Sequence, residues 1–252
     1  MAALAGTRSR EFQAFTKRAK MCENLEIVFD KNGITAGFTN RFGGVSEGKF
    51  SSLNLGDHVG DNPADVIKNR EILAQNLGVK KLKFMKQIHS NEVRILRDLN
   101  DELPPCDGLV TDLKGAMLCV LVADCSPVLI VDSVRGVVAA VHAGRAGVVG
   151  QICTNAVKLM KSEFGCQSHD LCAFVGANIK KDCYEVGELN LGKFERYKNG
   201  GKFDMNAALK DEFAALSVRV KFSEICTHCD ERYFSYRRDG VTGRFCGFAM
   251  LK

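Results

Sequence analysis

Residues 106–147 read CDGLVTDLKGAMLCVLVADCSPVLIVDSVRGVVAAVHAGRAG and form the most apolar part of the 252-residue chain. Three runs within this stretch have the length of strands and are rich in Val and Leu, which favours buried β-structure. The predicted strands are Met117–Ala123, Pro127–Val131 and Gly136–Val141, with a turn at Asp132–Gly136 between the last two. The stretch therefore predicts the buried centre of a β-sheet.

Polar side chains stand at the ends of these predicted strands. Cys125 follows the first strand and His142 follows the last, with Asp112 and Asp124 at strand edges as well. A free cysteine is often buried for packing alone. An aspartate, in contrast, is seldom buried without a partner. A thiol, an imidazole and two carboxylates at strand ends therefore indicate the core of an active site.

Outside this stretch, strands and helices are mixed without a regular β–α repeat, which predicts an α+β fold with a mixed sheet. Asn62 suits the cap of a helix, Pro63 its first turn and Gly78 its end. Further strands are predicted at Glu26–Phe29, Ile34–Thr39, Leu82–Ile88, Glu92–Leu96, Leu171–Gly176, Val218–Phe222 and Arg244–Leu251. Helices are predicted at Pro63–Leu77, at Val148–Phe164, and from Asp204 or Asn206 to Leu216.

The segment 39–63 contains five glycines and many small polar residues, without helical or strand periodicity. It is predicted to be a long ordered loop or a hairpin, and loops of this length in compact domains are usually functional. The alternative is a flexible surface loop. Arg41 and Asn54 are its candidate substrate-binding residues.

Composition bounds the possible functions. Hydrophobic content of 46% and charged content of 26% are typical of a soluble globular protein. Residues 1–20 carry a net charge of +4 out of the total of +5, so no basic patch is left for nucleic acid on the rest. We predict that residues 1–20 are a basic leader, disordered or not native, and that residues 21–252 form a single catalytic domain.

The location follows from what the chain lacks. No apolar run has the roughly 20 residues of a membrane span, and the first residues lack the apolar core of a secretory signal. Eleven cysteines in a long chain without an export signal indicate reduced thiols rather than a disulfide framework. The protein is therefore predicted to be cytoplasmic, without a membrane partner.

Three residues from separate strand ends form the strongest chemical pattern. His89, Cys125 and His142 match a catalytic zinc site, in which three protein ligands leave a fourth position for water or substrate. The same residues support a second hypothesis, in which Cys125 is a nucleophile and His142 its base, without a metal. The spacing leaves both open.

Two C-terminal motifs carry weaker signals. Residues 226–229 read CTHC, but zinc ribbons need a second cysteine pair, so this pair is interpreted as packing with at most a weak metal contact. Residues 235–240 read SYRRDG, and Arg237 in this motif is a candidate for phosphate binding. A solvated turn with internal ion pairs is the alternative.

Seven segments occur in the order typical of one family. They read GFTNRFGGVSEGKFSSLNLGDHVGD, KQIHSNEV, DGLVTD, VADCSPVLI, VHAG, CYEVG and FSYRRDGVTGR. In these segments the chain resembles the YfiH-like, or laccase-domain, proteins over residues 34–251. The resemblance implies an α/β sandwich, one zinc per chain on His89, Cys125 and His142, and purine nucleoside phosphorylase activity on adenosine, inosine and methylthioadenosine, with adenosine deaminase activity.

The chain departs from the family pattern at two places. Family members usually read HAGWRG, whereas residues 142–147 read HAGRAG, which places Arg145 where tryptophan is usual. The usual CCYEVG is DCYEVG here, with Asp182 and a single Cys183. The first departure puts the substrate preference in doubt.

The resemblance suggests further roles within a pocket for nucleoside and phosphate. Arg41, Arg145 and Arg237 are candidates for phosphate, and Asp124 for the edge of the base. A multicopper oxidase needs more histidines than five, and none here forms a His-X-His pair, so copper would be adventitious. The alternatives are a hydrolase of peptidoglycan precursors, a weak copper-dependent polyphenol oxidase, and a metal-binding protein without enzymatic activity. The oligomeric state stays open.

Overall fold

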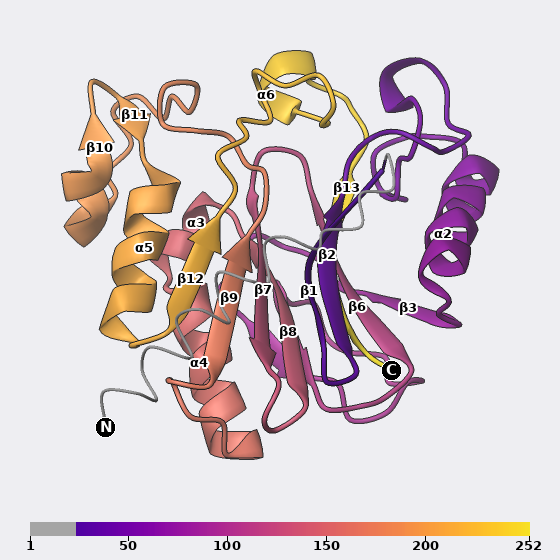
Figure 1. Ribbon diagram of the computed structural model, residues 1–252. Coiled ribbons are helices and arrows are strands. Elements are labelled where there is room, and N and C mark those ends of the chain that lie inside the picture. Colours follow the sequence, from indigo (N-terminus) through magenta and orange to yellow (C-terminus); the bar gives the residue numbers. More distant parts are fainter. Residues whose placement is uncertain (1–23) are drawn as a thin grey trace.

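The computed structural model describes residues 24–252, so the predicted leader lies outside the described residues. The described residues form four layers: two β-sheets pack face to face, the helix α2 (Pro63–Leu77) covers the outer side of one, and further helices cover the outer side of the other (Figure 1). The predicted α+β sandwich with mixed sheets is therefore confirmed. Within the described residues, no helix is long and apolar enough to cross a membrane.

The first sheet has five strands in the order β1-β2-β13-β6-β3. All neighbours are antiparallel except β3 and β6, which run parallel. The strands are β1 (Leu25–Lys31), β2 (Ile34–Thr39), β13 (Phe245–Leu251), β6 (Ala116–Val122) and β3 (Lys81–Phe84). One face of β6 packs against the second sheet, whereas the other packs beneath helix α2 (Pro63–Leu77).

The second sheet has six strands in the order β12-β9-β7-β8-β5-β4 and is also mixed. Its strands are β12 (Arg219–Phe222), β9 (Leu171–Val175), β7 (Ser126–Asp132), β8 (Val137–Ala143), β5 (Gly108–Thr111) and β4 (Val93–Ile95). Every residue of β7 and β8 is buried, because the first sheet covers one face and helices cover the other. This double burial explains why the two strands are continuous apolar runs in the sequence.

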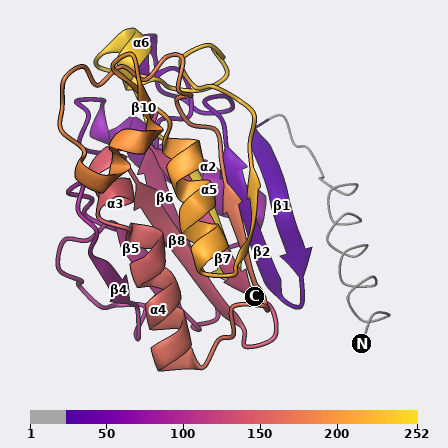
Figure 2. The ribbon, with the colours of Figure 1, turned by 90° about the vertical axis from the view of Figure 1, so that its left-hand side faces the viewer.

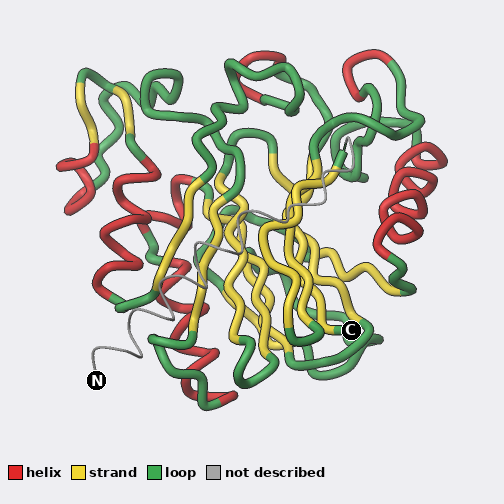
Figure 3. Tube along the Cα trace, viewed as in Figure 1, coloured by secondary structure: helices red, strands yellow, loops and turns green. Residues whose placement is uncertain are grey.

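Helices α3 (Arg145–Val149), α4 (Ile152–Phe164) and α5 (Met205–Ala215) lie on the outer side of the second sheet (Figure 2). Loops gather at the end of the sandwich near the short helix α6 (Tyr236–Asp239), as the green segments of Figure 3 show. The remaining short elements are the 3-10 turns η2 (Gly48–Phe50) and η3 (Gly192–Tyr197), and the hairpin of β10 (Lys198–Asn199) and β11 (Lys202–Phe203).

The predicted helix caps are confirmed. The side chain of Asn62 accepts a hydrogen bond from Ala64 N at the start of α2, and Gly78 ends that helix in the left-handed conformation. Asp204 rather than Asn206 caps α5, because its carboxylate accepts from Ala207 N. The segment 39–63 is an ordered loop, and the buried amide of Asn69 in α2 bonds to Val45, Ser46, Ser52 and Asn54 of it.

Three predictions about local structure are wrong, and one strand was missed. The strand predicted at Leu82–Ile88 ends at Phe84, and the helix predicted at Val148–Phe164 is interrupted at Gln151, whose φ is 57°. Strand β5 was not predicted, because a run of four residues carries little periodicity. Asp112 is exposed at the opposite end of β5 from His142, since β5 and β8 are antiparallel with Gly108 opposite Val141.

Candidate active site

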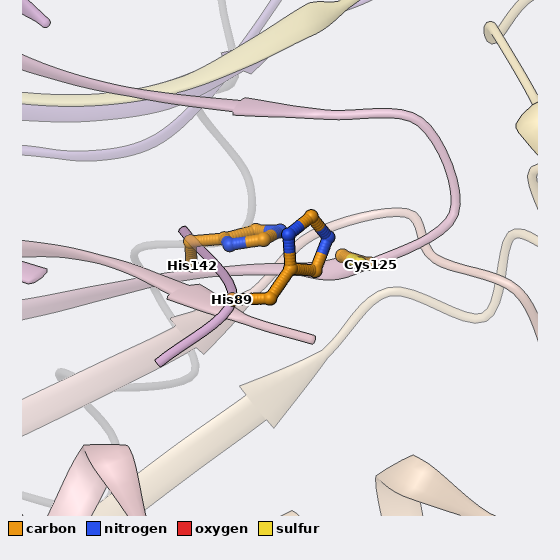
Figure 4. A group of neighbouring side chains, drawn as sticks. All are labelled: His89, Cys125 and His142. Atoms are coloured by element: carbon orange, nitrogen blue, oxygen red, sulfur yellow. The ribbon is translucent and has the colours of Figure 1, made fainter. Parts of the chain in front are cut away.

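Three residues far apart in the sequence meet at one end of the sandwich. Cys125 lies in the short turn between β6 and β7, and His142 is the penultimate residue of β8. His89 lies in the loop after β3, with a φ of 58°, and not at a strand end as predicted. Their possible ligand atoms all lie within 4.8 Å of one another, and the two imidazole rings stand nearly perpendicular at 82° (Figure 4).

Asp107 holds two of these three residues in place. Its buried carboxylate accepts hydrogen bonds from the backbone N–H groups of Ile88, His89 and Ser90, at 3.2, 3.0 and 2.7 Å. The same carboxylate lies 2.7 Å from Nδ1 of His142. One side chain therefore shapes the loop that carries His89 and orients the ring of His142.

The charges of the site are strongly coupled. Burial by itself raises the pKa of the Cys125 thiol, but His142 and His89 more than offset this effect and hold the pKa at about 6. Burial lowers the pKa of His142, whereas the Cys125 charge and the hydrogen bond to Asp107 raise it to about 9. Cys125 therefore has the thiolate character that metal ligands and nucleophiles need.

The donor set fits a zinc ion. One thiolate and two imidazoles are donors that zinc prefers, and three protein ligands leave a fourth position for water or substrate. His142 contacts a carboxylate through Nδ1, which leaves Nε2 free for a metal, an arrangement common around zinc-binding histidines. His89 is exposed, so the site is open to solvent.

Gly144 closes one side of this group. A Cβ atom at this position would lie 3.1 Å from Cys125 Sγ, 3.3 Å from His89 Cδ2 and 3.6 Å from His142 Cε1. Its φ of −74° is accessible to any residue, so the glycine is required by the space and not by its backbone conformation. The HAG sequence thus reflects the close packing of the three candidate ligands.

Replacing Gly144 with alanine is expected to lower the affinity for zinc about tenfold or more, because the added methyl group displaces the thiol and the His89 ring. The fold is expected to be retained, since the backbone conformation suits alanine. Competition with a chromophoric chelator measures the affinity, and Ala146→Ser, at an exposed position two residues further, is the control. Unchanged zinc affinity in Gly144→Ala would show that the ligands do not depend on this close contact.

Cationic side chains lie beside the three candidate ligands. Burial raises the pKa of Tyr184, as does the Cys125 charge, while Arg145, through its charge and a hydrogen bond, and the charge of Arg237 lower it. Arg237 also stacks over the Tyr184 ring at 5.4 Å. Burial lowers the pKa of Arg244, and the charges of Cys125 and Asp124 oppose this effect. Arg145 and Arg237 thus lie beside Tyr184, and Tyr184 and Arg244 are both close enough to Cys125 to respond to its charge.

The other candidate residues bond mainly within the protein. Asp124 accepts from Thr227 Oγ1 at 2.7 Å and from the backbone N–H of Arg237 at 2.6 Å. Asn54 is buried and bonds to Gly56, Asp61 and the backbone of Arg244. These contacts shape the loops of this end of the molecule, and the substrate-binding roles of both residues remain predictions.

Arg41 lies further along the same loops. Its Nε donates to Ser51 O at 2.7 Å, and its guanidinium lies 4.6 Å from the centre of the Phe234 ring. Burial lowers the pKa of Arg41, with Asp239 and Glu231 opposing and Arg238 adding to the effect. Its contacts connect the segment 39–63 to the C-terminal loop, and its role in phosphate binding also remains a prediction.

Sequence reasoning missed Asp107, Tyr184 and Arg244. Asp107 immediately precedes an apolar run, which is the same signal that singled out Asp124. The run after it is short, so β5 was not recognised and Asp107 with it. Tyr184 and Arg244 stand in the motifs CYEVG and FSYRRDGVTGR, which was the available signal, but neither adjoins another candidate ligand in the sequence because both reach the site through long-range packing.

Comparisons with known proteins identify the family of the chain. Residues 35–252 match the family described as multi-copper polyphenol oxidoreductase laccase. A purine nucleoside phosphorylase of Corynebacterium glutamicum is 41% identical, with 85% of this chain and 93% of that protein aligned, and one of Streptomyces coelicolor is 38% identical, with 87% and 96% aligned. The crystal structure of the hypothetical protein YfiH of Bacillus licheniformis superimposes with a TM-score of 0.84 at 30% identity, covering 93% of this chain and 98% of that one. The chain therefore belongs to this YfiH-like, laccase-domain family.

Proposed function

We propose that this protein is a zinc-dependent purine nucleoside phosphorylase that also deaminates adenosine. The observation that carries the proposal is the convergence of His89, Cys125 and His142 next to a group of arginines. Relatives at 38–41% identity are named purine nucleoside phosphorylases, which supports the same activity here. Nucleoside and phosphate are the proposed substrates.

The residues of the chain supply distinct parts of this chemistry. Zinc bound to the three ligands supplies a Lewis acid that activates water at neutral pH. Asp107 holds the proton at Nδ1 of His142 and so directs Nε2 into the site. Arg145, Arg237 and Arg244 neutralise the charge of phosphate, which planar guanidinium groups bind well. Asp124 fixes the start of α6 and thereby the position of Arg237.

The family description refers to copper, but the residues do not support a multicopper oxidase. Such enzymes need two histidines and a cysteine for one copper and a further histidine-rich cluster for the others. The chain has five histidines, and His58 and His169 are exposed beside neighbouring aspartates. We therefore propose zinc as the resident metal and treat copper as an adventitious occupant of the same site.

The proposed activities separate in one experiment. The protein is incubated with adenosine, inosine or methylthioadenosine, with and without phosphate, and the bases are resolved by chromatography. Free base that forms only with phosphate is the expected sign of phosphorolysis, and inosine formed from adenosine is the expected sign of deamination. If neither product forms at any zinc concentration, the proposed function is wrong.

Arg145→Ala is expected to raise the KM for phosphate about tenfold, because one charge-assisted contact in a partly solvated site contributes about 1.5 kcal/mol. The KM for the nucleoside is expected to change less, since the guanidinium recognises the anion. Initial rates over a matrix of both substrate concentrations measure the two constants. An equal rise in the two KM values would show that Arg145 does not recognise phosphate specifically. Arg135→Ala, on the distant turn between β7 and β8, is the control.

The geometry also supports a second candidate, a metal-free hydrolase. Cys125, His142 and Asp107 form the order of nucleophile, base and orienting carboxylate that occurs in cysteine hydrolases. Such an enzyme would act on an amide or ester, peptidoglycan precursors among them. Activity that survives chelation and dialysis but is lost on alkylation of Cys125 would favour this candidate.

A further inference from the structure

A second cluster of metal-binding side chains lies outside the candidate active site. Residues 226–229, which read CTHC, form a tight turn in which Cys229 N and Asp230 N donate to Cys226 O, at 3.2 and 3.0 Å. Cys183 approaches this turn from the segment after β9. The possible ligand atoms of Cys183, His228 and Cys229 all lie within 4.8 Å of one another.

The distances in this cluster match the edges of a zinc tetrahedron. Zinc–sulfur bonds of about 2.3 Å place two thiolates about 3.8 Å apart, and a sulfur and an imidazole nitrogen slightly closer. Cys183 Sγ lies 3.3 Å from Cys229 Sγ, and Cys229 Sγ lies 3.9 Å from His228 Nδ1. The sulfur–sulfur distance is shorter than the tetrahedral edge and the sulfur–nitrogen distance is longer, so coordination requires these side chains to rotate.

Cys226 is the further thiol in the same turn, three residues before Cys229, and its backbone carbonyl accepts from Cys229 N. Within this cluster, only the ligand atoms of Cys183, His228 and Cys229 lie within 4.8 Å of one another. The Cys226 side chain therefore has to rotate toward them to become a fourth ligand. A divalent metal binds cysteines as thiolates, so its binding releases their protons and its charge offsets the repulsion between the sulfurs.

The backbone around Cys226 is arranged for a thiolate. Lys180 N donates to Cys226 Sγ at 3.4 Å. The guanidinium of Arg238 donates to the carbonyl oxygens of Thr227, His228 and Tyr233, at 2.9, 3.3 and 2.9 Å, which holds the turn in one conformation. Metal ligands held by neighbouring hydrogen bonds in this way lose little entropy on binding.

We propose that Cys183, Cys226, His228 and Cys229 bind a second zinc ion, in a closed site with a structural role. Three sulfurs and one imidazole leave no position for substrate, which distinguishes this site from the open one at Cys125. The interpretation of the CTHC pair as packing, and the prediction of one zinc per chain, are revised accordingly. The CTHC turn lacks the second cysteine pair of a zinc ribbon, and in this proposal Cys183 supplies the remaining sulfur.

The position of this site gives it a function. Thr227, inside the turn, donates to the carboxylate of Asp124, which immediately precedes Cys125. Cys183 immediately precedes Tyr184, which adjoins Arg145 and Arg237. A metal bound to the cluster therefore links the segment that carries Tyr184 to the C-terminal turn that carries Thr227. Both segments contact residues of the candidate active site. It acts as a brace and takes no part in the reaction.

Zinc content in matched variants tests the proposal, with protein purified under reducing conditions, supplied with zinc and then dialysed. The full chain is expected to hold about two zinc ions, Cys125→Ala about one, Cys229→Ala about one, and the double variant close to none. Cys229 is exposed, so its replacement leaves the core intact. His169→Ala, which alters an exposed histidine elsewhere, is expected to keep both ions.

X-ray absorption at the zinc edge identifies the ligands. In Cys125→Ala the remaining zinc is expected to show mainly sulfur neighbours at about 2.3 Å, and His228→Ala in that background is expected to weaken its binding. Wild-type zinc content in Cys229→Ala would overturn the proposal. A Cys183–Cys229 disulfide, found by peptide mapping of protein that holds a single zinc, would overturn it as well. Both outcomes are independent of whether the protein acts on nucleosides.

Discussion

Cys125→Ala is expected to lower nucleoside phosphorolysis and adenosine deamination by about 10³-fold or more. The thiolate is the only anionic group among the three candidate ligands, so its loss removes most of the zinc at that site. A metal that stabilises charge in the transition state contributes several kcal/mol, and about 4 kcal/mol corresponds to a factor of 10³ in rate. Elemental analysis and steady-state rates on the same preparation measure both effects.

The matched control is Cys172→Ala, which removes a buried thiol from β9 that lies next to Arg219 and outside both metal-binding groups. This variant is expected to keep its zinc and its activity, with at most a modest loss of stability. Full activity in Cys125→Ala would refute the nucleophile hypothesis and a catalytic role for zinc held by Cys125. Unchanged zinc content would refute Cys125 as a ligand.

Asp107→Ala is expected to destabilise the protein and to disorganise the site at once. The change leaves the ring of His142 and the N–H groups of Ile88, His89 and Ser90 without their acceptor. Removing one partner of a buried charged network costs about 3–5 kcal/mol, and losing the carboxylate behind a metal-binding histidine costs about 10–100-fold in metal affinity. Denaturant unfolding and chelator competition measure the two effects.

The conservative variant separates orientation from folding. Asp107→Asn keeps the shape of the side chain, but an amide N–H facing His142 favours the tautomer with its proton on Nε2, which blocks the metal. This variant is therefore expected to retain most of its stability and to lose zinc affinity. Asp112→Asn is the control, because that aspartate is exposed at the other end of β5. Equal zinc affinity in both variants would remove Asp107 from the site.

Asp107 is also expected to make the stability of the metal-free protein depend on pH. Burial raises the pKa of Asp107, but hydrogen bonds from His142 and Ser90 outweigh it and lower the pKa from 3.8 to about 2. A depressed folded-state pKa contributes stability above pH of about 4 that is lost as the pH falls through about 2. The shift corresponds to about 2 kcal/mol. Asp107→Asn lacks this carboxylate, so its free energy of unfolding should change less between pH of about 4 and 2 than that of the unmodified protein. An identical acid transition in the two proteins would contradict the prediction.

Much of the fold follows from local sequence. The unbroken apolar runs of β7 and β8 predict strands buried on both faces. A strand with one face in solvent would instead show polar residues at alternate positions. Asn62, and Asp204 or Asn206, predict helix starts, because a cap side chain satisfies free N–H groups within the next turn, and the structure selects Asp204 for the second helix. Cys125 and His142 were found because a thiol and an imidazole are unusual at the ends of such strands.

The tertiary structure alone decided which residues support these ligands. Asp107 meets His142 across 35 positions because β5 and β8 are antiparallel neighbours, and Cys183 meets Cys229 across 46 positions because two loops converge at one end of the sandwich. The sequence by itself determined most of the strands, the start of α2 and the candidate ligands, since each depends on neighbours within a few residues. Sheet register and loop convergence depend on the packing of the whole chain, so the carboxylate behind the first site and the third cysteine of the second became visible only in three dimensions.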